Sequence, residues 1–310
     1  GRPHYDIPSA IALDQVGNVY VTGTSGRNWT DRDIVTLKYD SNGNELWAKR
    51  YDAGRDESAA LATDSLGNVY VVGTSNGEYT TIKYDINGNE AWIKKYGGGA
   101  AKSVVIDTFD NVYVAGSNNG DYVTIKYDTN GNEVWNKRYD SGSGDSVSSM
   151  VIDDSNNIYV TGSGDGDYVT IKYDSNGKEL WSKRSPIGSK PSGLAVDAAG
   201  NVYITGNCDN GYPASPGVYQ SGFGGSYDVF VTKINPSGNS LIYTTYLGGT
   251  YGERGIAIAV NDMGEVYVAG KNSLGGFPVT SGAFQTKNGG DYDGFISKLN
   301  VDGDGLIYST

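Results

Sequence analysis

One short phrase recurs along the chain, and this repetition limits the possible folds more than any other feature of the sequence. The phrase Asn-Val-Tyr-Val-Thr-Gly at residues 18–23 returns, with small changes, in five later places. The central tyrosines of the six copies are Tyr20, Tyr70, Tyr113, Tyr159, Tyr203 and Tyr267. Most of them lie about 45 residues apart, a period typical of proteins that repeat one supersecondary unit.

Each copy contains the same four strand-like runs. A run of small and aliphatic residues, such as Ala10–Leu13, leads through a turn of the form Asp-x-x-Gly-Asn to the Val-Tyr-Val phrase. A third run, such as Ile34–Tyr39, is joined by Asn-Gly to a fourth, such as Glu45–Tyr51. Asn-Gly between two alternating runs is a strong hairpin signal. No long segment shows a helical period with caps, so we predict strands and no helices.

Four-stranded units repeated roughly every 40–50 residues are typical of β-propeller blades. We therefore predict an all-β fold, a six-bladed β-propeller of four-stranded antiparallel blades, as a single β-propeller domain over residues 1–310. The expected blades cover approximately residues 7–52, 53–97, 98–140, 141–186, 187–247 and 248–310. Tyr5-Asp6 aligns with Tyr51-Asp52, so each blade should be contiguous in sequence and the first and last blades should meet by side-chain packing.

Composition excludes several classes of function. The 24 Lys and Arg against 36 Asp and Glu give a net charge of -12, which argues against binding nucleic acid or an anionic membrane. Cys208 is the only cysteine, which excludes an internal disulfide and a Cys-based zinc site. His4 is the only histidine, so a Ser-His-Asp catalytic triad would have to use it. No apolar run is long enough for a transmembrane segment. Because the sequence begins without Met or a signal peptide, we expect a processed form or a piece of a longer protein.

The fifth and sixth copies carry a specific motif. Residues 197–249 contain Asp-Ala-Ala-Gly-Asn-Val-Tyr-Ile-Thr-Gly, then Pro-Gly-Val-Tyr-Gln, then Tyr-Asp-Val-Phe-Val-Thr-Lys-Ile-Asn-Pro-Ser-Gly, and the last copy repeats it with Gly282-Ala-Phe-Gln285. This closely resembles the SBBP family of bacterial and archaeal β-propeller repeats, and copies one to four are similar to its shorter form. The resemblance implies an extracellular or cell-surface propeller, often part of a larger protein, with no agreed activity and no catalytic residues to carry over.

The family name refers to seven blades, whereas this sequence holds six copies. Either the propeller closes with six blades, or one blade is missing from this piece.

An acidic residue begins the third strand of every copy. These residues are Asp33, Glu78, Asp121, Asp167, Asp228 and Asp293. They form either a ring of carboxylates that binds cations or a set of caps that accept backbone N–H bonds from the connection before the strand. We favour the caps, because a residue present in every repeat usually serves the repeat.

Two further charge patterns follow the strands. The third strand of each copy carries a lysine, such as Lys38, and in copies one to four a glutamate across the hairpin is expected to pair with it. The fourth strands of those copies carry basic pairs, such as Lys49-Arg50, which should protect the outer edge. Copies five and six have Thr244-Thr245 and Ser309-Thr310 there, so we predict that these unprotected edges are a docking surface.

Residues that break the repeat are the better candidates for a site. Several such charged residues precede the first strands and are expected at one mouth of the central channel. An aromatic residue stands between the second and third strands of copy one, beside charged residues, as sugar binding requires. The predicted ligand-binding residues are Arg55, Glu57, Lys190, Glu253, Arg254 and Trp29.

A calcium site is the one cofactor hypothesis that the sequence offers. Residues 300–305, Asn-Val-Asp-Gly-Asp-Gly, place Asp302 and Asp304 in a calcium-like spacing. The same turn in copy five, residues 235–238, has no carboxylate, so a turn already accounts for the segment. We otherwise expect no cofactor.

Two functional hypotheses follow. The first is a non-enzymatic extracellular scaffold or binding module for a protein or glycan partner, with further domains of a longer parent protein as possible neighbours. The second is a carbohydrate-active enzyme, a hydrolase or lyase, with carboxylates at the channel mouth. The chain lacks the common phosphate-binding, serine-nucleophile and zinc-protease motifs, so we favour the first.

Overall fold

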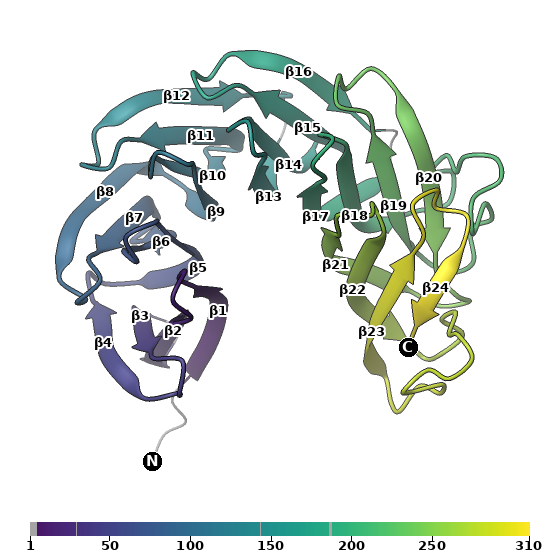
Figure 1. Cartoon of the computed structure of the whole chain (residues 1–310), viewed down its shortest axis with the longest axis horizontal. Helices are drawn as coiled ribbons and strands as arrows, with labels where there is room; N and C mark the ends of the chain where they lie inside the picture. The colour runs from purple at the N-terminus through teal and green to yellow at the C-terminus, as the bar shows by residue number, and fades with distance from the viewer. Residues whose placement is uncertain (1–4, 29, 143, 186–187) are drawn as a thin grey trace. The chain divides into compact units, whose positions relative to one another are not determined.

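The computed structural model describes residues 5–28, 30–142, 144–185 and 188–310. His4 and Trp29 lie outside these residues. The chain divides into two compact units, Gly1–Met150 and Val151–Thr310. Within each unit the strands form four-stranded antiparallel sheets that follow chain order, as the labels in Figure 1 show. Each sheet is one blade, and the boundary between the units falls inside the first strand of the fourth blade.

Three blades lie wholly in the first unit. Their strands are β1 (Tyr5–Leu13), β2 (Val19–Asn28), β3 (Asp31–Tyr39) and β4 (Glu45–Tyr51); β5 (Asp56–Thr63), β6 (Val69–Ser75), β7 (Glu78–Tyr84) and β8 (Glu90–Gly98); β9 (Ala100–Ile106), β10 (Val112–Asn118), β11 (Asp121–Tyr127) and β12 (Glu133–Tyr139). The first strands are longer than predicted, and the β1–β2 pairing shifts register between Pro8 and Ala10.

The remaining strands complete the other three blades. They are β13 (Ser146–Ile152), β14 (Ile158–Gly164), β15 (Asp167–Tyr173) and β16 (Glu179–Arg184); β17 (Ser189–Val196), β18 (Val202–Cys208), β19 (Asp228–Ile234) and β20 (Leu241–Leu247); β21 (Glu253–Val260), β22 (Val266–Ser273), β23 (Tyr292–Leu299) and β24 (Leu306–Ser309). The prediction of six four-stranded antiparallel blades, each contiguous in sequence, is confirmed. That residues 1–310 form one domain, with the first and last blades in contact, stays a prediction.

The described residues form no helix, as the sequence predicts. It follows that this part of the chain offers no helical segment with the length and apolar character needed to cross a membrane.

The turn between the first two strands of a blade is built on one aspartate. In the second blade, Asp64 Oδ1 accepts from the backbone N–H groups of Leu66 and Asn68, at 3.1 and 2.9 Å. Its Oδ2 accepts from Asn68 Nδ2 at 2.8 Å and from the buried Tyr70 hydroxyl at 3.0 Å. The same aspartate and tyrosine pair up in four other blades, as Asp14 and Tyr20, Asp107 and Tyr113, Asp153 and Tyr159, and Asp197 and Tyr203. The repeated tyrosine therefore fixes the turn to the core.

The repeated lysine of the third strand completes this cluster. Lys83 Nζ lies 3.8 Å from Asp64 Oδ2 and 4.9 Å from the centroid of the Tyr70 ring, and it donates to the Thr129 carbonyl of the next blade at 3.1 Å. The predicted pairing of this lysine with a glutamate across the hairpin is wrong. A register shift after Lys83 places Glu90 opposite Tyr84, and the lysine instead lies buried against the tyrosine ring.

The tryptophan of the fourth strand joins consecutive blades. Trp47 Nε1 donates to the Ile86 carbonyl at 3.1 Å, in the hairpin turn of the second blade. Gly88 in that turn has a φ of +80°, and a Cβ there would lie 2.9 Å from the Trp47 ring. Glycine is required at this position both by the backbone conformation and by the ring that packs on it.

The outer edge of the fifth blade is covered by the chain itself. Thr244 and Thr245 are buried, because the long connection before β19 folds over β20. The Ser215 N–H donates to the Thr244 carbonyl at 2.8 Å, and the Gln220 N–H donates to Thr245 Oγ1 at 3.0 Å. In blade six Ser309 is likewise buried, and its carbonyl accepts the Thr280 N–H at 3.0 Å. The prediction that these edges are a docking surface is therefore wrong, since their backbone groups are already paired.

We expect Asp64→Ala to lower the free energy of unfolding by about 3 kcal/mol, because it leaves the buried Lys83 without its carboxylate and the Tyr70 hydroxyl without its acceptor. Asp85→Ala is the matched control. Asp85 caps the hairpin turn of the same blade through Asn87 and Asn89 but has no buried lysine or tyrosine partner. Urea denaturation of both variants measures the difference, and equal losses would contradict the role assigned to the cluster.

Candidate functional site

The structure brings together two of the predicted site residues in the first unit. Glu57 Oε1 lies 2.8 Å from Arg32 Nη1 and 3.3 Å from Arg55 Nη2. Arg32 is buried, whereas Arg55 is exposed. Both guanidinium groups contact the same oxygen of Glu57, so its carboxylate is held between two positive charges. This trio is therefore better suited to fixing the first blade against the second than to acid–base chemistry.

The other predicted charged residues lie in the second unit, near the start of the first strands of blades five and six. Lys190 is exposed near the start of β17. Arg254 places its guanidinium 5.1 Å from the centroid of the Tyr227 ring. Glu253, by contrast, is fully buried, and it accepts the Gly249 N–H at 3.1 Å.

Burial dominates the electrostatics of Glu253. It raises the pKa of this carboxyl to about 7, and the charge of Asp228 adds to the effect. Asp228 is also fully buried, and burial raises its pKa as well. The two carboxyls are an acidic pair inside the junction of blades five and six, where a polymeric substrate cannot reach them.

A raised pKa makes stability depend on pH. Between about pH 4.5 and 7 the unfolded chain loses the Glu253 proton while the folded chain keeps it, so the stability of the folded state falls as pH rises through this window. We expect Glu253→Gln to remove this decline and to become the more stable form at neutral pH, by at most about 3 kcal/mol. Denaturation of both proteins at several pH values measures the effect, and parallel pH profiles would show that Glu253 ionises normally.

Three predicted site residues remain. Trp29 lies outside the described residues. Asp302 is exposed, and Asp304 closes its own turn, since its Oδ1 accepts from Asn300 Nδ2 at 2.6 Å. Neither aspartate belongs to a group of three converging ligand side chains among the described residues. Calcium at this turn stays a prediction.

The acidic residues that begin the third strands have two roles. In blades one to four they pair with the basic residue of the fourth strand, as Arg50 does with Asp33 and Lys95 with Glu78 at 3.0 Å. In blade five, Asp228 accepts the Gly224 N–H at 2.8 Å. In blade six, Asp293 likewise accepts the Gly289 N–H. The prediction that these residues cap the backbone is therefore confirmed for blades five and six. It is wrong for blades one to four, where they form ion pairs.

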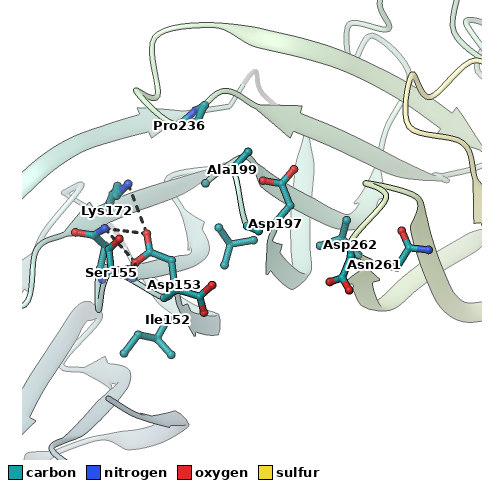
Figure 2. A pocket seen from close by; sticks show the side chains of 15 residues that line it. Ile152, Asp153, Ser155, Lys172, Asp197, Ala199, Pro236, Asn261 and Asp262 are labelled. Atoms are coloured by element: carbon teal, nitrogen blue, oxygen red, sulfur yellow. Dashed lines mark hydrogen bonds and ion pairs between the residues drawn. The ribbon is translucent and has the colours of Figure 1, made fainter. Parts of the chain in front are cut away.

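One cavity of the second unit lies among the turns between first and second strands (Figure 2). It measures about 390 Å³ and is lined by Asp153, Lys172, Asp197 and Asp262 among others. Figure 2 shows the Asp153 carboxylate turned toward Lys172, whose Nζ lies 3.8 Å away. Asp153 and Asp197 both bind the asparagine and tyrosine of their own turns. The polar side chains that line this cavity are therefore largely engaged in hydrogen bonds within their own turns.

A second cavity of about 430 Å³ lies in the long connection of blade six. Asn272 and Asn288 both line it. Asn272 is 7% exposed and its Oδ1 has no hydrogen-bond partner, and the buried Nδ2 of Asn288 also has none. Phe284, 94% exposed, lies at the same cavity, and Asp293 accepts from Gln285 Nε2 at 3.1 Å.

The sequence analysis missed this cavity, although a signal for it exists. Cys208 in blade five and Asn272 in blade six hold the same place, since each pairs with the acidic residue that begins the next strand. Cys208 is buried in an apolar cluster with Tyr212 and Phe230. The asparagine of blade six therefore places an amide where the similar blade five has an apolar contact, although blade three carries Asn118 at this place as well.

Comparison with known proteins agrees with the fold. The SBBP β-propeller repeat model matches residues 1–28 and 52–80, which cover the first two strands of blade one and the corresponding part of blade two. These two stretches of the chain match the SBBP repeat. The resemblance noted in the sequence is thereby confirmed. No curated protein matches the chain in sequence.

Solved structures extend the likeness to nearly the whole chain. The Dos1 propeller is 10% identical, with a TM-score of 0.59, over 98% of this chain and 84% of its own. The C-terminal WD40 domain of Sif2 is 10% identical, with a TM-score of 0.55, over 99% and 87%. A protein of unknown function from Bacteroides caccae is 12% identical, with a TM-score of 0.53, over 94% and 92%. At this identity the likeness shows the all-β propeller fold alone.

Proposed function

We propose that this SBBP-repeat propeller is a non-catalytic binding module and that its ligand is a neutral saccharide held at the blade-six cavity. The observation that carries the proposal is the pair of unmatched amide groups, Asn272 Oδ1 and Asn288 Nδ2, that line one cavity beside the exposed ring of Phe284.

The chemistry of the cavity fits a sugar. A buried amide atom without a partner costs free energy, and a ligand that supplies the missing hydrogen bond recovers it. Asn272 Oδ1 needs a donor and Asn288 Nδ2 needs an acceptor, and sugar hydroxyls act as both. Phe284 offers an apolar ring face, on which the C–H face of a pyranose can pack.

Charge favours a neutral sugar over an acidic one. The chain carries a net charge of -12, which repels polyanions at low salt. At the cavity itself, Lys287 and Asp293 contribute one charge of each sign.

The carboxylates support binding in preference to hydrolysis. A glycosidase needs two carboxyl groups that flank the substrate bond. Glu253 and Asp228 are fully buried, and Glu57 is engaged by Arg32 and Arg55. We expect no turnover of a polysaccharide panel by the full chain. Activity abolished by Glu57→Gln or Glu253→Gln would instead establish the enzyme hypothesis.

We further propose an extracellular or cell-surface location, with other domains of a longer parent protein as neighbours. The support is the SBBP repeat, since the resemblance implies secreted propellers that are often part of larger proteins.

Calorimetric titration with neutral oligosaccharides, such as cellopentaose, xylopentaose and chitotetraose, tests the saccharide proposal. We expect one of them to bind, and Phe284→Ala to weaken it about tenfold, the equivalent of 1.4 kcal/mol. Asn288→Asp, which removes the Nδ2 donor and keeps the acceptor for Gly290, should weaken it as well. Phe109→Ala is the control, because Phe109 is an exposed aromatic residue of blade three, far in sequence from the cavity.

A packing role for Phe284 predicts a different result. Its counterpart in blade five, Tyr219, is half-buried against the cluster that blades five and six share. If Phe284 serves the same purpose, Phe284→Ala lowers the melting temperature, and no oligosaccharide binds the wild-type chain. That outcome would refute the saccharide site.

A further inference from the structure

Three carboxylates converge where the first blade meets the second. They belong to Asp33 at the start of β3, Asp52 just after β4 and Asp56 at the start of β5. One oxygen from each lies within 4.8 Å of the others. Asp33 is 4% exposed and Asp56 is 0% exposed, so two of the three carboxylates are buried.

Each buried carboxylate has one oxygen in use and one without a partner. Asp33 Oδ2 pairs with Arg50, and Asp56 Oδ2 accepts the Ala53 N–H at 2.7 Å. The Oδ1 atoms of both residues are buried and accept no hydrogen bond. Two buried anionic oxygens without donors are costly, and a cation is the partner that satisfies both at once.

The local charge also calls for a cation. Asp33, Asp52 and Asp56 carry three negative charges and Arg50 one positive charge, so the group has an excess of two. A divalent ion matches the excess.

An equivalent cluster shows what the first junction lacks. Asp121, Asp140 and Asp145 converge in the same way between blades three and four. There the Ser141 N–H donates to Asp145 Oδ2 at 2.7 Å, and the Ser141 hydroxyl donates to Asp145 Oδ1. The residue that follows Asp52 is Ala53, in the position that Ser141 has after Asp140. Ala53 has no hydroxyl group that could donate a hydrogen bond. The first cluster is therefore left with an acceptor that the second has satisfied internally.

We propose that the Asp33, Asp52 and Asp56 carboxylates bind Ca²⁺. Two oxygens bound to one Ca²⁺ at 2.3–2.6 Å lie at most about 5 Å apart, and one oxygen from each of the three carboxylates lies within 4.8 Å of the others. Mg²⁺ demands near-ideal octahedral geometry and gives up its water reluctantly, so it is seldom held by protein carboxylates alone, and Ca²⁺ is the better match. With three protein carboxylates we expect an affinity of about 10⁻⁴–10⁻³ M, the range of extracellular calcium modules.

The bound ion would tie β3 of the first blade to β5 of the second, so its effect on stability is measurable without any ligand. After treatment with a chelator, the full chain is titrated with CaCl₂ while its melting temperature is followed, with MgCl₂ at the same concentrations and NaCl of matched ionic strength as controls. We expect CaCl₂ to raise the melting temperature well beyond either control. Calorimetry gives the affinity.

Two variants identify the site. Asp56→Asn should weaken calcium binding about tenfold or more by removing a buried anionic ligand. Ala53→Ser should weaken it while preserving the fold, because the new hydroxyl can donate to Asp56 Oδ1 as Ser141 does to Asp145. Asp140→Asn, at the equivalent cluster, should leave calcium binding unchanged.

Either of two results overturns the proposal. The first is a melting temperature that responds to CaCl₂ no more than to matched NaCl. The second is a calcium response that Ala53→Ser and Asp56→Asn leave intact. Because the proposal uses blades one and two only, its failure would say nothing about saccharide binding at blade six.

Discussion

The buried contact of a lysine with an aspartate and a tyrosine is the interaction on which each blade depends. In the second blade the Asp64 carboxylate orders its own turn, receives the Tyr70 hydroxyl and neutralises Lys83. Lys83 in turn reaches a carbonyl of the next blade. Removing any one member leaves a buried polar group unmatched, which is expensive in a low-dielectric interior. This mutual dependence explains why the same residue types recur in copy after copy.

The same requirement shapes the outer edges. Blades one to four have short connections and carry basic residues on the fourth strand, one of which pairs with the acid of the third. Blades five and six have threonine or serine there, and a long connection supplies the missing hydrogen bonds, as Gln220 does to Thr245. Charge and chain coverage are alternative ways to satisfy an exposed strand edge. A blade that has one does not need the other.

The sequence predicted the architecture because period, turn residues and strand alternation are local signals. The Asn-Gly hairpins and the repeated Tyr phrase located every blade. It failed where a residue's role depends on a neighbouring strand. A register shift determines which residue lies opposite Lys83. The burial of Thr245 depends on a connection that lies some 25 residues before it. The candidate site fared similarly. Glu253 was predicted to bind a ligand at the channel mouth, but its burial beside Asp228 follows from the packing of blades five and six, which the sequence does not show.

A repeat that satisfies its own polar groups leaves little chemistry available for a ligand. In most copies the turn aspartate, the tyrosine and the lysine bind one another, and the cavity among those turns is already lined by paired groups. Two of the unmatched buried oxygens lie where one copy departs from another. Ala53 stands where another junction has Ser141, and Asn272 stands where blade five has Cys208. Each departure leaves an acceptor without a donor. In a repeat protein such positions are where a ligand can contribute binding energy that the fold does not already use.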